Sequence, residues 1–156
     1  IISKKHYGID GCSAPQYAFK IKKLGKALSN LLNSYNGNFE YSENTQTMIN
    51  AILDNPKFIG GSNNLDSNLI KISNRNIFCK GGAEGVFLFV HLKKEIFGIL
   101  KVKDGNERAL SSAMNALLKK FKILDRDELN QFNSWNTTNM YNHAKIKIGS
   151  IITKIE

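Results

Sequence analysis

Two apolar runs, Ile77-Phe78-Cys79 and Val86–Leu92, flank the polar, glycine-rich segment Lys80-Gly81-Gly82-Ala83-Glu84-Gly85. Apolar residues fill both sets of alternating positions in the second run, a pattern typical of a central strand covered on both faces. After Lys93-Lys94-Glu95, the segment Ile96–Val102 is predicted to return as the next antiparallel strand. These segments constrain the chain to an antiparallel sheet centred on Val86–Leu92.

Helical periodicity flanks the predicted sheet on both sides along the sequence. Apolar residues recur three or four positions apart in several segments, and each of these predicts an amphipathic helix. The segments are 21–33, 43–53, a short stretch capped by Asp66 or Ser67, and a long stretch from Leu110 to Phe121. Pro56 ends the second of these helices, because the residue before a proline avoids the α region.

The two ends of the chain show other patterns. Tyr7–Pro15 predicts a short strand that ends in a tight loop, and Pro15 is expected to stop any further ladder. The tail is polar around 131–142, and 145–148 alternates as a strand. No repeat or linker divides the 156 residues. We therefore expect one domain, 1–156, of the α+β class, with an antiparallel sheet flanked by helices.

Lys80 stands out because a charged side chain between two hydrophobic strands is costly unless its amine has a task. Gly81 and Gly82 follow it and carry no side chains, so another molecule can approach the backbone closely. A site for a small polar substrate can be built on a strand in this way. The alternative is a hairpin entry with a solvated lysine.

Composition excludes several classes of function. The net charge is +9, but only Lys20, Lys22, Lys23 and Lys26 cluster, and no aromatic residues interleave with them, so nucleic acid is not the expected partner. No segment is long and apolar enough to span a membrane, and residues 1–6 do not form a secretory signal. The two cysteines do not form a disulfide framework, so we expect a reducing, cytoplasmic setting.

Three motifs follow one another along the chain, and together they resemble the bacterial L-asparaginase II family, the rhizobial-type enzymes. They are Asp10-Gly11-Cys12-Ser13-Ala14-Pro15, Lys80-Gly81-Gly82-Ala83-Glu84-Gly85, and Lys101-Val102-Lys103-Asp104-Gly105 with Arg108-Ala109. Gly60-Gly61, Asp66, Asn142 and Gly149 also fit the family, whereas Asn63-Asn64 stands where a Gly-Arg pair is common.

The resemblance implies a fold similar to serine β-lactamases and penicillin-binding proteins, of which this chain resembles the C-terminal half. In those enzymes an S-x-x-K motif supplies the nucleophile, and a Lys-Thr-Gly motif lines the same cleft. Lys80-Gly81-Gly82 occupies the place of the second motif. No serine of the sequence is followed three residues later by lysine, so the nucleophile is expected on a missing half.

The resemblance also implies roles for individual residues. Lys80 would be catalytic, either accepting a proton from that serine or holding the substrate carboxylate as a cation. Backbone amides of Gly81, Gly82 and Ala83 would contact an oxyanion or carboxylate; the alternative is a β-bulge. Glu84 would contact the substrate amine or pair with a lysine.

The motif near the N-terminus carries two further expectations. Asp10 would orient a ligand or the substrate ammonium group, or else be a turn residue that satisfies backbone amides. Cys12 resembles a cysteine that helps to bind zinc in this family, with co-ligands outside this chain; the alternative is a small buried hydrophobe. Cys79 is expected in the core.

Two function hypotheses follow. In the first, the complete protein is an amidohydrolase that converts L-asparagine to L-aspartate and ammonia by a Ser/Lys mechanism, and this chain is inactive alone. Its partners would be L-asparagine and either the missing half or a second copy in a homodimer. In the second, the chain is an inactive truncated domain that acts as a binding or structural module.

Overall fold

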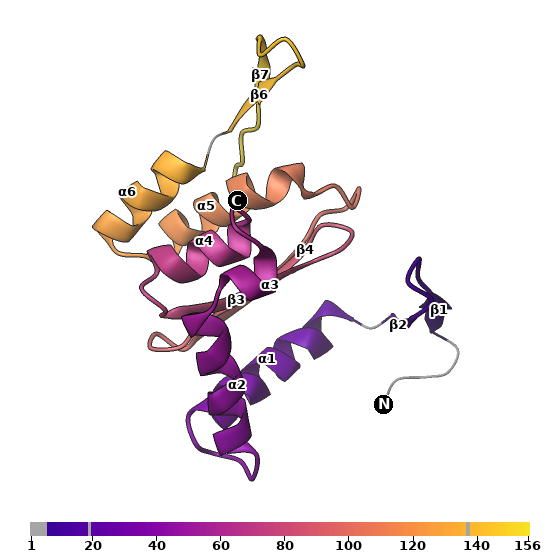
Figure 1. Cartoon of the computed structure of the whole chain (residues 1–156), viewed down its shortest axis with the longest axis vertical. Helices are drawn as coiled ribbons and strands as arrows, with labels where there is room; N and C mark the ends of the chain where they lie inside the picture. The colour runs from indigo at the N-terminus through magenta and orange to yellow at the C-terminus, as the bar shows by residue number, and fades with distance from the viewer. Residues whose placement is uncertain (1–5, 19, 137) are drawn as a thin grey trace.

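The centre of the molecule is a three-stranded antiparallel sheet in the order β3-β4-β5 (Figure 1). The computed structural model describes residues 6–18, 20–136 and 138–156. In it, β3 is Ile77–Gly82, β4 is Val86–His91 and β5 is Ile96–Lys101. The predicted order is confirmed, because β4 lies between the other two strands and pairs with both in antiparallel register.

Helices surround this sheet and confirm the α+β class. They are α1 (Ile21–Tyr35), α2 (Ser42–Asp54), α3 (Lys57–Gly60), α4 (Leu65–Ile72), a 3₁₀ turn η1 (Glu107–Ala109), α5 (Leu110–Lys120) and α6 (Arg126–Trp135). None of the helices in the described ranges is long and apolar enough to cross a membrane.

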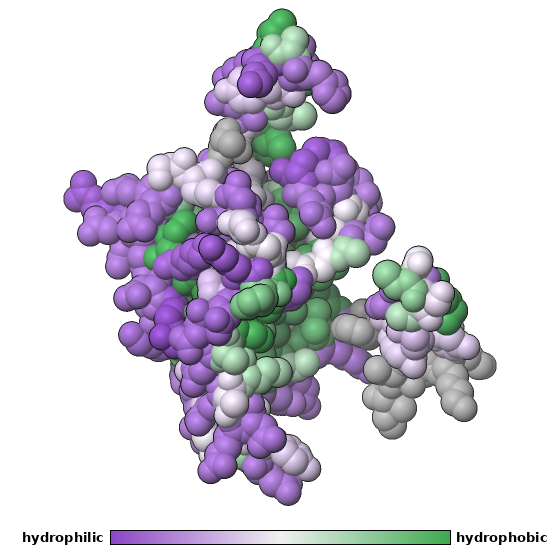
Figure 2. All heavy atoms as spheres, viewed as in Figure 1, coloured by the Kyte–Doolittle hydropathy of each residue, from purple (hydrophilic) through white to green (hydrophobic). Residues whose placement is uncertain are grey.

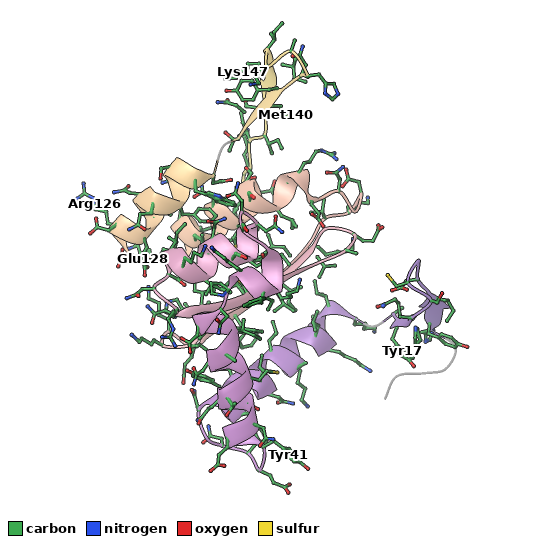
Figure 3. All side chains as sticks on the ribbon, in the orientation of Figure 1. Tyr17, Tyr41, Arg126, Glu128, Met140 and Lys147 are labelled. Carbon is green, nitrogen blue, oxygen red and sulfur yellow. The ribbon has the colours of Figure 1, made fainter. Side chains whose placement is uncertain are left out.

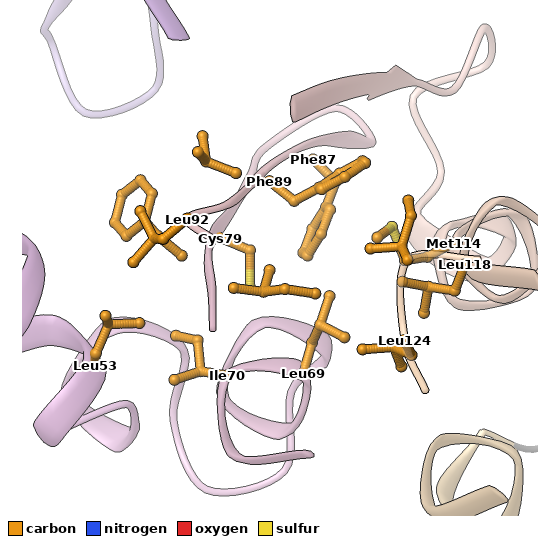
Figure 4. Packing of buried hydrophobic residues seen from close by; sticks show 14 of the residues in the cluster. Leu53, Leu69, Ile70, Cys79, Phe87, Phe89, Leu92, Met114, Leu118 and Leu124 are labelled. Carbon is orange, nitrogen blue, oxygen red and sulfur yellow. The ribbon is translucent and has the colours of Figure 1, made fainter. Parts of the chain in front are cut away.

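One face of the sheet is fully covered. Phe87 and Phe89 project from this face of β4 and are 1% and 3% exposed. In Figure 4 they pack together with Cys79 of β3 against side chains of α4 and α5, including Leu69 and Met114. The expectation that Cys79 belongs to the core is confirmed, since it is 0% exposed.

The opposite face is covered over only part of its length. Helix α1 packs against β5 and against α2, and Val90 of β4 is buried beneath this layer. Val86 and Leu88, nearer the other end of β4, are half-buried. In Figure 2 apolar atoms are visible over the sheet beside α1. The prediction that both faces of this strand are covered therefore holds for one end only.

Two hairpins extend from the body at the chain ends (Figure 1). The first pairs β1 (Tyr7–Ile9) with β2 (Pro15–Tyr17), and the second pairs β6 (Asn139–Tyr141) with β7 (Lys147–Ser150). Figure 3 labels Tyr17 on the first, and Met140 and Lys147 on the second.

Pro15 does not stop the ladder, so this prediction was wrong. It is the first residue of β2 and lies opposite Ile9 in the register. A proline is tolerated at the first position of an edge strand, because an N–H that points away from the partner is not needed for pairing.

Helix α6 was not predicted, and its second half lies in the segment 131–142 that the sequence marked only as polar. It begins with a capping box, in which Asp125 accepts from the N–H of Glu128 and Glu128 accepts from the N–H of Asp125. Phe132 on its inner side is 0% exposed. The D-x-x-E pattern at 125–128 is an N-terminal helix signal that the sequence analysis did not use.

The cap of α4 also differs from the prediction. The helix begins at Leu65 after Asn64, and no side chain caps it. Asp66 and Ser67 lie within the first turn and are 4% and 0% exposed. Their side chains turn toward β3 and Pro56, so tertiary contacts use the groups that the sequence assigned to a local cap.

Candidate functional site

A cleft of about 620 Å³ lies where β3 ends. Its walls come from the α3–α4 connection, the start of α4, the end of β3, η1 with the start of α5, and the end of α6. The sequence motif Lys80-Gly81-Gly82-Ala83 lines it, together with Asp66 and Trp135. Segments far apart in the sequence therefore converge on the motif that the sequence analysis singled out.

Lys80 lies at the outer edge of this cleft. Its side chain is 45% exposed, and its Nζ is 3.8 Å from Oδ2 of Asp66. The same amine donates a hydrogen bond to the carbonyl of Gly81. The amine is thus neither fully solvated nor buried in the sheet, and an ion pair at the cleft wall holds it.

The glycines of the motif continue the strand without a bulge. Gly81 pairs with Phe87 and Gly82 with Val86 in unbroken register, so the β-bulge alternative is wrong. A Cβ built at Gly81 would have its nearest contact at 3.6 Å, and so would one at Gly82. These are ordinary contacts, so packing within the chain does not require glycine at either position.

Asp66 is the buried carboxylate of the cleft. Oδ2 accepts from the N–H of Gly81 at 3.2 Å, and Oδ1 accepts from the N–H of Ser67 at 3.0 Å. The thiol of Cys79 donates to the Asp66 carbonyl at 3.4 Å. Burial raises the pKa of the Cys79 thiol most, and the negative charge of Asp66 raises it further. The N–H of Gly81, one of three amides expected to face substrate, is therefore already engaged.

Helix α6 closes the cleft with Trp135. The indole Nε1 donates to Oδ1 of Asn63 at 2.9 Å, which links α6 to the loop before α4. The Trp135 ring lies 5.7 Å from the ring of Phe132, centroid to centroid. Sequence reasoning missed Trp135 because it did not recognise α6, and it named Asn63 only as a departure from the family pattern.

Asp10 lies in the hairpin loop, away from the cleft (Figure 1). It accepts from the N–H groups of Ala14 and Cys12 at 3.0 and 2.8 Å, and from the amide of Gln16 at 2.8 Å. These hydrogen bonds lower the pKa of the Asp10 carboxyl, and the bond from the Ala14 N–H has the largest effect. They are the contacts of a turn residue, and the structure does not bring Asp10 near Lys80.

Cys12 lies in the same loop and is exposed, so the alternative of a buried hydrophobe is wrong. Among the described residues, no group of three or more His, Cys, Asp or Glu side chains gathers to hold a metal ion. A tight zinc site needs several such donors. The part of the chain that the structure describes therefore does not by itself fit a zinc ion.

Glu84 lies outside the lining of the cleft. It occupies the β3–β4 turn with a φ of 62°, and its carbonyl accepts from Nζ of Lys101. Its carboxylate lies beside Gly105, where an added Cβ would come within 2.5 Å of Oε2. Gly105 belongs to the third sequence motif. Within this motif Asp104 accepts a hydrogen bond from the Arg108 guanidinium at 2.7 Å.

Comparison with known proteins adds one match. The model of the L-asparaginase II family matches residues 2–153, which is nearly the whole chain. No protein of established annotation matches the chain.

Proposed function

Because the chain belongs to the L-asparaginase II family, we propose that it forms one wall of the active site of an asparaginase-like amidohydrolase. The complete protein would hydrolyse L-asparagine to L-aspartate and ammonia. The observation that carries the proposal is the convergence of Lys80, Gly82 and Ala83 on one cleft together with the buried carboxylate of Asp66. Asparagine carries an ammonium, a carboxylate and an amide, and such a cleft offers groups of both charges and backbone amides.

In the proposed reaction a serine hydroxyl attacks the carbon of the side-chain amide. A lysine amine takes the serine proton and passes it to the leaving ammonia, and water then releases aspartate from the acyl-serine. The ion pair between Lys80 and Asp66 supports Lys80 as a positive charge that holds the substrate carboxylate.

In this proposal the serine comes from polypeptide outside these 156 residues, because the sequence contains no Ser-x-x-Lys. The half-covered sheet face supports this arrangement. Lys80, Leu88 and Ile99 form one cross-strand row on it, and Leu88 and Ile99 are only half-buried. We propose that the chain acts as a single C-terminal half and that the nucleophile-bearing half, or a second copy, packs here.

Cys12 is the one residue of this chain that we propose as a zinc ligand. The Cys12 side chain is exposed, and it would bind the ion together with ligands from another polypeptide. No step of the reaction is assigned to the metal.

The test is ammonia release from L-asparagine by the purified chain, with and without the co-expressed Ser-x-x-Lys half. We expect turnover only with both parts. L-glutamine serves as the parallel substrate and tests the preference for asparagine. Turnover by the chain alone, or none from the assembled protein, would contradict the proposal.

The half-buried face also favours a second candidate, a non-catalytic binding domain. In that case the face would bind a partner or another copy without an active site. Light scattering across a salt series separates apolar association, which salt does not weaken, from association driven by the net charge of +9.

A further inference from the structure

We propose that Asp66 is a positioning residue of this cleft, whose carboxylate fixes the backbone at Gly81 and holds the amine of Lys80. The proposal deepens the function proposed above and rests on it for the catalytic consequence. Asp66 touches no substrate in this scheme and acts through Lys80 and Gly81.

The first support is the position of β3 at the edge of the sheet. An edge strand presents N–H and C=O groups that no neighbouring strand pairs with, and a buried polar group without a partner costs free energy. At Gly81 the N–H donates to Asp66 and the carbonyl accepts from Lys80. Asp66 and Lys80 together therefore replace the missing strand at this point of β3.

The second support is how tightly the carboxylate is enclosed. A Cβ built at Gly60 would lie 1.8 Å from Oδ1 of Asp66 and 2.4 Å from its Cγ. Such contacts are impossible without movement, so only glycine at position 60 lets α3 approach the carboxylate. Ser67 adds a bond from its Oγ to the carbonyl of Pro56 at 2.9 Å, which ties α4 to the same segment.

The third support is charge. The Asp66 side chain is 6% exposed, and a carboxylate buried to this extent needs hydrogen bonds and an opposite charge. Lys80 provides that charge at 3.8 Å. The other titratable groups around it are Glu107 in the cleft lining and the buried thiol of Cys79. Lys80 is thus the cation that compensates the Asp66 carboxylate.

The test uses the full chain and amide hydrogen exchange at Gly81. Asp66→Ala removes the acceptor, and we expect exchange at Gly81 to become about 10- to 100-fold faster, the factor for one hydrogen bond to a charged group. Asp54→Asn is the matched control: Asp54 forms an ion pair with Arg75 at 2.5 Å, away from the cleft lining, and should leave Gly81 unchanged. Unchanged exchange in Asp66→Ala would overturn the proposal.

A second variant separates the charge from packing. Asp66→Asn keeps the shape of the side chain and removes its charge, so exchange at Gly81 should be faster than in the wild type and slower than in Asp66→Ala. Glu107→Gln should leave the exchange unchanged. Wild-type exchange in Asp66→Asn would mean that the charge of the carboxylate does not act on Gly81.

Glycine substitutions test the same contact without touching Asp66. Gly60→Ala should displace the carboxylate and reproduce the faster exchange at Gly81. Gly25→Ala in α1 is the control, because a Cβ there meets nothing within 4 Å. If the Gly81 amide exchanges as slowly in Gly60→Ala as in the wild type, the enclosed Asp66 carboxylate does not hold this end of β3.

Activity of the assembled protein provides the last measurement. Asp66→Asn should lower kcat/KM for asparagine by about tenfold or more, and Asp66→Glu should restore part of it. An assembled protein without asparaginase activity would refute the proposed function, while the exchange measurements would still decide the role of Asp66. Exchange effects at Gly81 with unchanged kinetics would reduce Asp66 to a purely structural residue.

Discussion

Lys80 illustrates how a single side chain between two apolar strands is accommodated. Its amine meets the carboxylate of Asp66 and the carbonyl of Gly81 at the outer edge of β3. Glycine at positions 81 and 82 is not required by packing, because an added Cβ would make only ordinary contacts. The fold does not demand these glycines, which supports the proposal that a ligand comes close to the backbone here.

Replacing Lys80 by methionine should affect both stability and function. It leaves the buried Asp66 carboxylate without its cation, so we expect the free energy of unfolding to fall by more than about 1 kcal/mol. Asparaginase activity of the assembled protein should fall at least about 100-fold. Urea unfolding and ammonia release measure the two effects. Lys71→Met, at an exposed position in α4, is the control, and equal activity in both variants would remove Lys80 from the mechanism.

His91 makes stability depend on pH. It is 4% exposed, and its Nδ1 accepts from the N–H of Lys94 at 3.2 Å. Burial first, and then the positive charges of Lys94 and Lys93, lower the pKa of His91. The unfolded chain then binds a proton more readily than the folded one. Stability is therefore full above the ordinary histidine pKa of about 6.5 and declines as pH falls below it.

The measurement is the urea midpoint at pH 7.5 and pH 5.5. The wild-type chain should lose more stability between these values than His91→Gln does. His143→Gln, in the exposed second hairpin, should behave like the wild type. Identical losses in the wild type and His91→Gln would exclude His91 as the cause.

At the scale of elements, the site depends on the helices that meet the end of β3. Helix α4 brings Asp66, and α6 brings Trp135. Each is positioned by a small number of specific contacts, the Asn63 bond to Trp135 and the close approach of Gly60 to Asp66. Changes at the ends of these helices should therefore reach the cleft without altering a cleft residue.

The cap of α6 offers such a change. Asp125→Ala removes the capping box with Glu128 and should destabilise the chain by about 1 kcal/mol. Trp135 is the only tryptophan of the sequence, so its fluorescence reports directly on the cleft wall during urea unfolding. Figure 3 shows Glu128 at the start of this helix. Asp127→Ala, outside the box, is the control, and an equal effect of both variants would contradict the role of the cap.

At the scale of the whole molecule, the two faces of the sheet differ. One face packs against α4 and α5, and the other carries α1 over one end and leaves Leu88 and Ile99 half-buried at the other. Lys80 belongs to the same cross-strand row as these two residues. A partner seated on them would contact the cross-strand row that contains Lys80.

Leu88→Gln tests this surface. Since Leu88 is only half-buried, the cost in stability should stay near about 1 kcal/mol. Co-purification with the Ser-x-x-Lys half, or self-association measured by light scattering, should be lost. Ile148→Gln, at a 63% exposed position on the second hairpin, is the control. Retained association in Leu88→Gln would place the partner elsewhere.

The local elements followed from the sequence alone. The alternation of apolar residues in 86–92 and its neighbours predicted three antiparallel strands in the observed order. Helical periodicity predicted α1, α2 and α5 to within a few residues at their ends. The glycine-rich segment after Lys80 pointed to a site at this strand end, where the structure has a cleft. Periodicity and glycine content are local properties, so a linear pattern is enough to detect them.

Only the tertiary structure decided which groups surround Lys80. Asp66 was expected as a helix cap but reaches Gly81, fifteen positions along the chain, and Trp135 arrives on a helix hidden in a polar segment. Asp10 and Cys12, expected near the site, lie instead on a hairpin apart from it. Such neighbours depend on how closely helices can approach one another and the sheet, as where Gly60 of α3 meets Asp66 of α4. That distance is set by three-dimensional packing of distant segments, for which the local pattern of residues carries no signal.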